Sequence, residues 1–142
     1  MGQSVASIRA GIAAKIADIT GFQESKQTPD YFGRTQDTIA HLGFTVQCNV
    51  STASEDRQRR VVGVYLNTQF RVIFAYRLRP LDAYPTDYDL AIDQESIIIR
   101  SIIGPYTTNN KFTLKYNGSS RAVPESQEYI IITIDFTANH TL

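Results

Sequence analysis

Alternation of apolar and polar residues dominates two segments of the chain and limits the folds open to it. In residues 42–50 every second residue is apolar: Leu42, Phe44, Val46, Cys48 and Val50. Residues 70–78 repeat the pattern with Phe70, Val72, Phe74, Tyr76 and Leu78. A period of two is typical of a strand with one buried face. The chain therefore contains half-buried strands whose apolar face needs a covering layer.

Further strands are predicted on either side of these segments. Residues 60–66 form a strand that joins residues 70–78 through the short Asn67-Thr68-Gln69 connection, which suits a hairpin. Near the end of the sequence, residues 112–116, 121–123 and 129–137 are predicted as strands, with a turn at Asn117-Gly118. Short connections favour antiparallel pairing.

Two segments have the three-to-four-residue apolar spacing of amphipathic helices. The first covers residues 5–20, with Ser4 as its N-cap and Gly21 at its end. Its apolar face is Val5, Ile8, Ile12, Ile16 and Ile19.

The second helix is predicted from Pro85 to Gly104-Pro105, with Thr86 as its N-cap. Its apolar face is Tyr88, Ala91, Ile92, Ile99, Ile102 and Ile103. The triplet Ile97-Ile98-Ile99 also fits a strand, but the flanking caps and the acidic first turn favour the helix.

The order of these elements predicts an α+β fold, in which two amphipathic helices pack on one face of a mainly antiparallel sheet of four to six strands. No linker, internal repeat or low-complexity tract divides the sequence, so residues 1–142 are predicted as a single domain. Extended loops are expected near residues 22–37, 51–58 and 106–111. No apolar run approaches the length needed to span a membrane.

Motifs for enzymatic chemistry are missing from the sequence. It contains neither a G-x-S-x-G elbow nor a phosphate-binding G-x-x-x-x-G-K-[ST] loop. His41 and Cys48 are seven residues apart, an odd spacing that sends them to opposite faces of a strand. Cys48 is predicted as a buried, inert thiol, and His140 is predicted on a loose terminal tail. We therefore expect neither catalysis nor a cofactor.

A cluster of acids at the start of the second helix raises the question of a metal site. Asp87, Asp89, Asp93 and Glu95 match a calcium loop only at its first two positions, and Ile92 stands where that loop needs glycine. A solvated acidic helix start is the better interpretation, and no metal site is predicted.

Charge is segregated along the chain, although 14 basic and 14 acidic residues balance overall. Residues 57–79 hold six arginines and no acid, and residues 82–95 hold five acids and no base. The two blocks could pair within one fold or between copies. A nucleic-acid-binding patch is a third interpretation, which the adjoining acidic block weakens. The candidate subunit-interface residues are Arg71, Arg77, Arg79, Asp87, Asp89 and Asp93.

Four segments together resemble a known family. They are the opening helix SVASIRAGIAAKIADITGF, the strand RVIFAYRLRP, the segment YPTDYDLAIDQESIIIRSIIG and the closing strand EYIIITIDFTANHTL. In order and character they resemble the tail terminator, or tail completion, proteins of long-tailed bacteriophages. The resemblance implies a virion structural protein without enzymatic activity or cofactor, whose α+β subunits form a hexameric ring.

The resemblance also implies a role and partners. Such a ring caps the tail tube, stops its elongation and joins the tail to the head, and DNA passes through its lumen without being read. The implied partners are the tail tube protein, neighbouring subunits and head-completion or neck proteins, in a virion assembled in the host cytoplasm. Alternative functions are a neck protein (head-closure or adaptor) and a small ligand-binding or nucleic-acid-binding module that uses the sheet face bearing the arginines.

Overall fold

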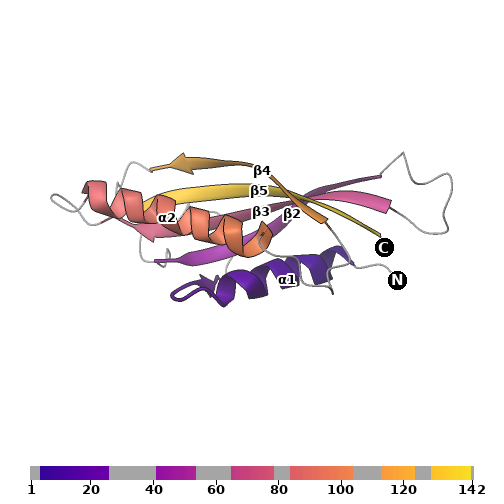
Figure 1. The fold of residues 1–142 in the computed structure, drawn as a ribbon, viewed down its shortest axis with the longest axis horizontal. Coiled ribbons are helices and arrows are strands. Elements are labelled where there is room, and N and C mark those ends of the chain that lie inside the picture. Colours follow the sequence, from indigo (N-terminus) through magenta and orange to yellow (C-terminus); the bar gives the residue numbers. More distant parts are fainter. Residues whose placement is uncertain are drawn as a thin grey trace.

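A curved sheet carries both helices on one of its faces in the computed structural model, which describes residues 4–25, 41–53, 65–78, 84–103, 113–123 and 129–141 (Figure 1). The elements are α1 (Val5–Ala17), β1 (Gln23–Glu24), β2 (Gly43–Ala53), β3 (Tyr65–Arg77), α2 (Tyr84–Ile103), β4 (Thr113–Ala122) and β5 (Tyr129–Thr141). The five strands of these ranges lie in the order β1-β2-β3-β5-β4. Only the β1–β2 pair is parallel. The predicted α+β class is confirmed.

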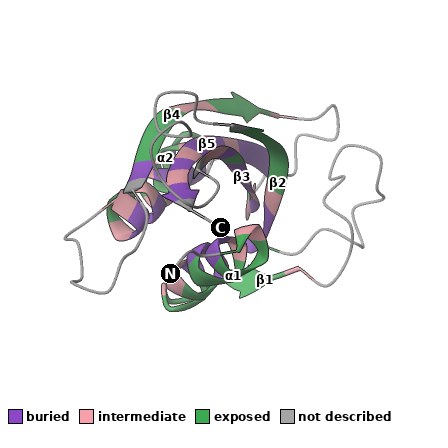
Figure 2. Cartoon of the chain, turned by 90° about the vertical axis from the view of Figure 1, so that its right-hand side faces the viewer, coloured by how far each residue is buried: buried purple, intermediate pink, exposed green. Residues whose placement is uncertain are grey.

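The core lies between the helices and one face of the sheet (Figure 2). Helix α1 contributes Ile8, Ile12 and Ile16, as its spacing predicts, and each is almost completely buried. The sheet contributes alternate residues of its central strands: Phe70, Val72 and Phe74 from β3, and Ile130, Ile132, Ile134, Phe136 and Ala138 from β5. A fully buried side chain of this size contributes about 1.5–3 kcal/mol, so this layer is the main source of stability.

Helix α1 begins as predicted and ends earlier. The Oγ of Ser4 accepts a hydrogen bond from the backbone N–H of Ser7 at 3.1 Å, which confirms the N-cap. The helix ends at Ala17, and Gly21 follows with φ of +94°, a conformation that favours glycine. This turn sends Phe22 into the core against Phe74, at a ring-centroid distance of 5.4 Å. The predicted loop at 22–37 thus starts with a core residue and β1, and residues 26–37 lie outside the described ranges.

Strand β3 runs without interruption through the predicted hairpin. Asn67, Thr68 and Gln69 pair with β2 on one side and with β5 on the other. The hairpin prediction is therefore wrong, because strands on both sides supply the hydrogen bonds that a turn would have supplied locally. Residues 60–64 of the predicted preceding strand lie outside the described ranges.

The Asn117-Gly118 turn is likewise absent, because β4 continues through it. The register with β5 shifts between Tyr116 and Gly118, which marks a β-bulge. Gly118 has φ of +150°, and the side-chain amide of Asn117 donates to Thr137 Oγ1 on β5. An Asn-Gly pair suits a bulge as well as a turn, and the unbroken neighbour β5 decides between them.

Strand β5 extends four residues beyond the predicted end and includes His140. This residue is 2% exposed, so its prediction as part of a loose tail is wrong. Its Nε2 lies 2.8 Å from Thr68 Oγ1, which in turn lies 2.9 Å from Ser51 Oγ. A chain of hydrogen bonds therefore crosses β5, β3 and β2 and fixes their register.

Strand β2 follows its predicted alternation only in its first half. Phe44 and Val46 are buried, whereas Cys48 and Val50 are exposed. The prediction of a buried Cys48 is wrong, although Cys48 keeps its predicted face opposite Phe70. The bulge between Cys48 and Val50 then places Val50 opposite Gln69, on the face away from the helices. Residues 51–53 of the predicted loop at 51–58 belong to this strand.

Residues Ile97-Ile98-Ile99 lie in helix α2, which confirms the predicted helix over the alternative strand. It begins at Tyr84, so Thr86 lies inside the helix and is not its N-cap. Its buried stripe is Asp87, Ala91, Glu95, Ile98 and Ile102. The predicted apolar face is rotated around the helix from this stripe. Four of its members are only half-buried: Tyr88, Ile92, Ile99 and Ile103. Residues 106–111, the third predicted loop, lie outside the described ranges.

The hydrogen-bond chain can be tested by removing its central hydroxyl. Replacing Thr68 with Val keeps the shape of a fully buried side chain but removes the contacts to Ser51 and His140. We expect T68V to lower the free energy of unfolding by about 1–2 kcal/mol in urea titrations. Ser51 is exposed, so S51A serves as the matched control and should cost less. Equal losses would contradict a buried, register-fixing role for Thr68.

Candidate functional site

Arg71, the first of the candidate interface residues, pairs within its own subunit. It lies on β3 directly opposite Asp135 of β5. Its Nε donates to Asp135 Oδ1 at 2.8 Å, and Nη2 donates to Oδ2 at 3.4 Å. These hydrogen bonds raise the pKa of Arg71 above its usual value. For Arg71, the structure therefore shows charge pairing within one subunit.

Arg77 and Asp87 meet in a pocket of about 230 Å³ at the start of α2. Arg77 is the last residue of β3 and is exposed, whereas Asp87 in the first turn of α2 is 3% exposed. His41, Tyr76 and Leu90 complete the lining. The basic and acidic blocks therefore meet here inside one subunit, beside apolar walls.

His41 is the titratable group of this pocket. Its Nδ1 accepts a hydrogen bond from the backbone N–H of Arg77 at 3.0 Å, and its ring packs edge-to-face on Tyr76. Desolvation, followed by the charge of Arg77, lowers the pKa of His41 below 6.5, and Asp87 partly opposes them. Because Nδ1 accepts, the neutral ring carries its proton on Nε2. The pocket thus holds a neutral imidazole between a guanidinium and a carboxylate.

Two of the remaining candidates lie on the outer face of α2. Asp89 and Asp93 are exposed, one helical turn apart. Leu90 and Ile97 share this surface, each 40% exposed. Arg79 lies outside the described residues, as do Asp82, Arg57, Arg59 and Arg60 of the two charge blocks.

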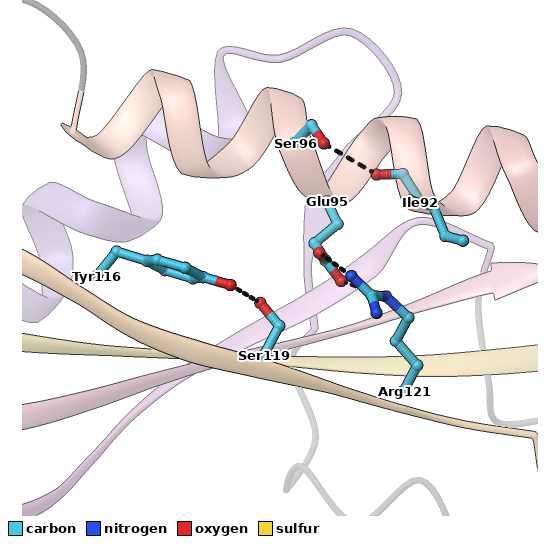
Figure 3. Close-up of polar contacts among 6 residues, drawn as sticks. All are labelled: Ile92, Glu95, Ser96, Tyr116, Ser119 and Arg121. Carbon is cyan, nitrogen blue, oxygen red and sulfur yellow. Dashed lines mark hydrogen bonds and ion pairs between the residues drawn. The ribbon is translucent and has the colours of Figure 1, made fainter.

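Sequence reasoning missed the most buried ion pair that the described residues contain. Glu95 of α2 is 3% exposed and accepts two hydrogen bonds from Arg121 of β4, at 2.9 and 2.6 Å (Figure 3). This contact raises the pKa of Arg121. The four-residue spacing of Asp87, Ala91 and Glu95 could have indicated this burial. It places both acids on the same helix face as the buried Ile98. The pair fastens the edge strand β4 to α2.

Cys48 is a surface thiol next to the bulge of β2. Partial desolvation raises its pKa, and the charge of Arg9 weakly opposes that effect. A thiol with a raised pKa is a poor nucleophile at neutral pH. The arrangement therefore does not activate Cys48 as a nucleophile.

Groups of metal ligands and membrane-spanning helices are both absent from the described part of the chain. No three of its His, Cys, Asp or Glu side chains are grouped to hold a metal ion. None of its helices combines the length and the apolar character that crossing a membrane requires. A comparison of the sequence with protein-family models and with curated proteins finds no match.

The Arg121–Glu95 and Arg71–Asp135 pairs differ in burial and make a matched comparison. Removing Arg121 leaves the carboxylate of Glu95 in the core, whereas Asp135 is 40% exposed and stays hydrated without Arg71. We expect R121A to cost about 2 kcal/mol of unfolding free energy. R71A should cost less than about 1 kcal/mol. Urea denaturation measures both, and equal costs would contradict the structural role of Glu95.

The lowered pKa of His41 makes stability depend on pH. Protonation is disfavoured in the folded state, so the unfolded state binds more protons once the pH falls below 6.5. We expect the free energy of unfolding to fall as the pH drops from about 7.5 to about 5.5, and H41Q should reduce this slope. The NMR titration of the His41 ring provides a direct check. A measured pKa above 6.5 would contradict the arrangement.

Proposed function

We propose that this protein is a structural component of a bacteriophage virion, a tail terminator. Its subunits form a hexameric ring that caps the tail tube, stops its elongation and offers the surface on which the head is joined. The observation that supports this most is the fold, with both helices on one face of a mainly antiparallel sheet. This is the architecture that the sequence resemblance implies.

In this proposal the protein works by shape and by contacts between subunits, without catalysis or a cofactor. Its partners are further copies of itself, the tail tube protein and head-completion proteins. DNA passes through the ring without sequence-specific contacts. The protein is assembled in the host cytoplasm and resides in the tail or neck of the virion.

The candidate charged residues differ in their suitability for contacts between subunits. Arg71 already pairs with Asp135, and Asp87 is buried in the pocket. Arg77, Asp89 and Asp93 are exposed. We therefore assign the charged part of the subunit contact to Arg77 of one copy facing Asp89 and Asp93 of the next.

The alternative functions fit the described architecture less well. Neck proteins more often form a small β-barrel or a helical bundle, and neither has two helices on one face of an open sheet. A module that binds nucleic acid through the arginine-bearing sheet face loses much of its positive potential, because Asp135 neutralises Arg71 there.

The ring is tested by electron microscopy of the purified protein, alone and mixed with tail tubes. We expect six-fold rings and a ring at one end of each tube, with the copy number confirmed by native mass spectrometry. A protein that stays monomeric at high concentration and leaves tube ends bare would contradict the proposal.

The charged contact is tested by reversing one exposed charge. R77E should weaken ring formation about tenfold or more, because like charges then face each other across the contact. Arg100, which is also exposed but lies in the last turn of α2, gives the matched control R100E. Equal ring formation by R77E and the wild type would contradict the assignment of Arg77.

A further inference from the structure

Most of the outer edge of β2 has no neighbouring strand in the described part of the chain. The parallel strand β1 covers only Gly43 and Phe44. From Thr45 to Ala53, β2 pairs on its inner side with β3, and the described ranges place no strand on its outer side. Within the described ranges, these nine residues therefore have a strand on one side only.

The hydrogen bonds next to β1 show which backbone groups point outward. Phe44 directs its carbonyl oxygen away from β3, where it accepts from Ser25 N–H at 2.7 Å. Backbone groups alternate in direction along a strand, so Val46 and Cys48 present their N–H and C=O groups on the same outer side. These groups can form a new ladder without breaking any hydrogen bond to β3.

The side chains of this edge do nothing to prevent pairing. Soluble proteins usually guard an exposed edge with charged residues or proline. Residues 45–53, with the sequence TVQCNVSTA, contain neither. The bulge at Cys48 is the one protective feature, and Val50 beside it is an apolar side chain 48% exposed. This composition favours a strand that is paired in its working state.

The opposite margin of the sheet offers a complementary edge. Strand β4 pairs only with β5 within the described ranges, so its other edge is also open (Figure 1). It is ten residues long and carries two positive charges, Lys115 and Arg121. Residues 45–53 of β2 carry no charge that would repel them. The chain of antiparallel pairs β2–β3–β5–β4 makes β4 run opposite to β2. A copy repeated about an axis along the strands would therefore present β4 antiparallel to β2.

We propose that the outer edge of β2, residues 45–53, pairs antiparallel with the outer edge of β4 in a second copy of this chain. The contact joins two different surfaces, so an open series of copies has one free β2 edge at one end and one free β4 edge at the other, and the sheet continues from copy to copy. A β2–β2 contact would instead close at two copies. The inference rests on the proposed function only for the closing of this series into a ring.

The pairing within the subunit predicts which side chains share a face across the new contact. Cys48 lies opposite Phe70, on the face that carries the helices. On β4, Tyr116 and Ser119 share that face, because they lie opposite Phe136 and Ile134. Ser120 lies opposite Thr133, on the other face. Directly opposed residues of an antiparallel pair share a face.

Disulfide cross-linking tests this geometry, because Cys48 is the only cysteine in the sequence. We expect S119C or Y116C, after mild oxidation, to give a ladder of covalent oligomers on a non-reducing gel. S120C is the matched control on the wrong face and should give little, and the C48S background should abolish the ladder. Absence of cross-links from both S119C and Y116C, or equal cross-linking from S120C, would overturn the proposal.

A backbone variant provides a second test that does not depend on the register. C48P removes an outward N–H that β3 does not use, while C48S keeps it. We expect C48P to retain the circular dichroism spectrum of the wild type and to weaken self-association at least tenfold, as measured by analytical ultracentrifugation. C48P with wild-type self-association would overturn the proposal. If C48P does not fold, the cross-linking result decides.

The outcomes also separate this inference from the proposed function. Six-fold rings that never cross-link through Cys48 would overturn the edge pairing and leave the tail terminator proposal standing. Cross-linked open chains that form no rings and leave tail tubes bare would support the edge pairing and contradict the terminator role.

Discussion

The pairing of β3 with β5 is the constraint on which the rest of the structure depends. The two strands match residue for residue from Tyr65 opposite Thr141 to Arg77 opposite Tyr129, without a bulge. One face of this pair supplies the largest buried side chains, against which both helices pack. Both neighbours, β2 and β4, contain bulges, so the irregularities of the sheet lie on either side of a regular centre.

Helix α2 combines apolar packing with two buried acids, and this shapes the charged surface. Glu95 and Asp87 lie on the same stripe as Ile98 and Ile102. Glu95 is satisfied by Arg121, and Asp87 lines the pocket of His41 and Arg77. Burying a carboxylate is costly unless it is paired, so the Glu95–Arg121 pair holds β4 in place against the helix. Asp89 and Asp93, by contrast, are exposed on the outer face of the helix.

Local pattern predicted the element types well and the continuity of strands poorly. The alternation in residues 70–78 and the spacing of Ile8, Ile12 and Ile16 report burial directly, so the α+β fold followed from them. The turn signals at Asn67-Thr68-Gln69 and Asn117-Gly118 failed because neighbours distant in sequence supply hydrogen bonds there. His140 was misplaced for the same reason, because the extent of a strand depends on its pairing. The sequence showed where the acidic and basic blocks lie, but it did not indicate that Glu95 pairs with Arg121.

The position of β5 has a consequence for the order of folding. It follows every other described strand in the sequence, yet it lies between β3 and β4. During synthesis, β3 has only β2 as a partner and β4 has none until β5 emerges. Contacts of such long sequence separation form slowly. The chain therefore acquires a finished edge at β4 only when the whole sheet has assembled. In the edge pairing proposed above, partly made subunits would lack this edge and could not join through it.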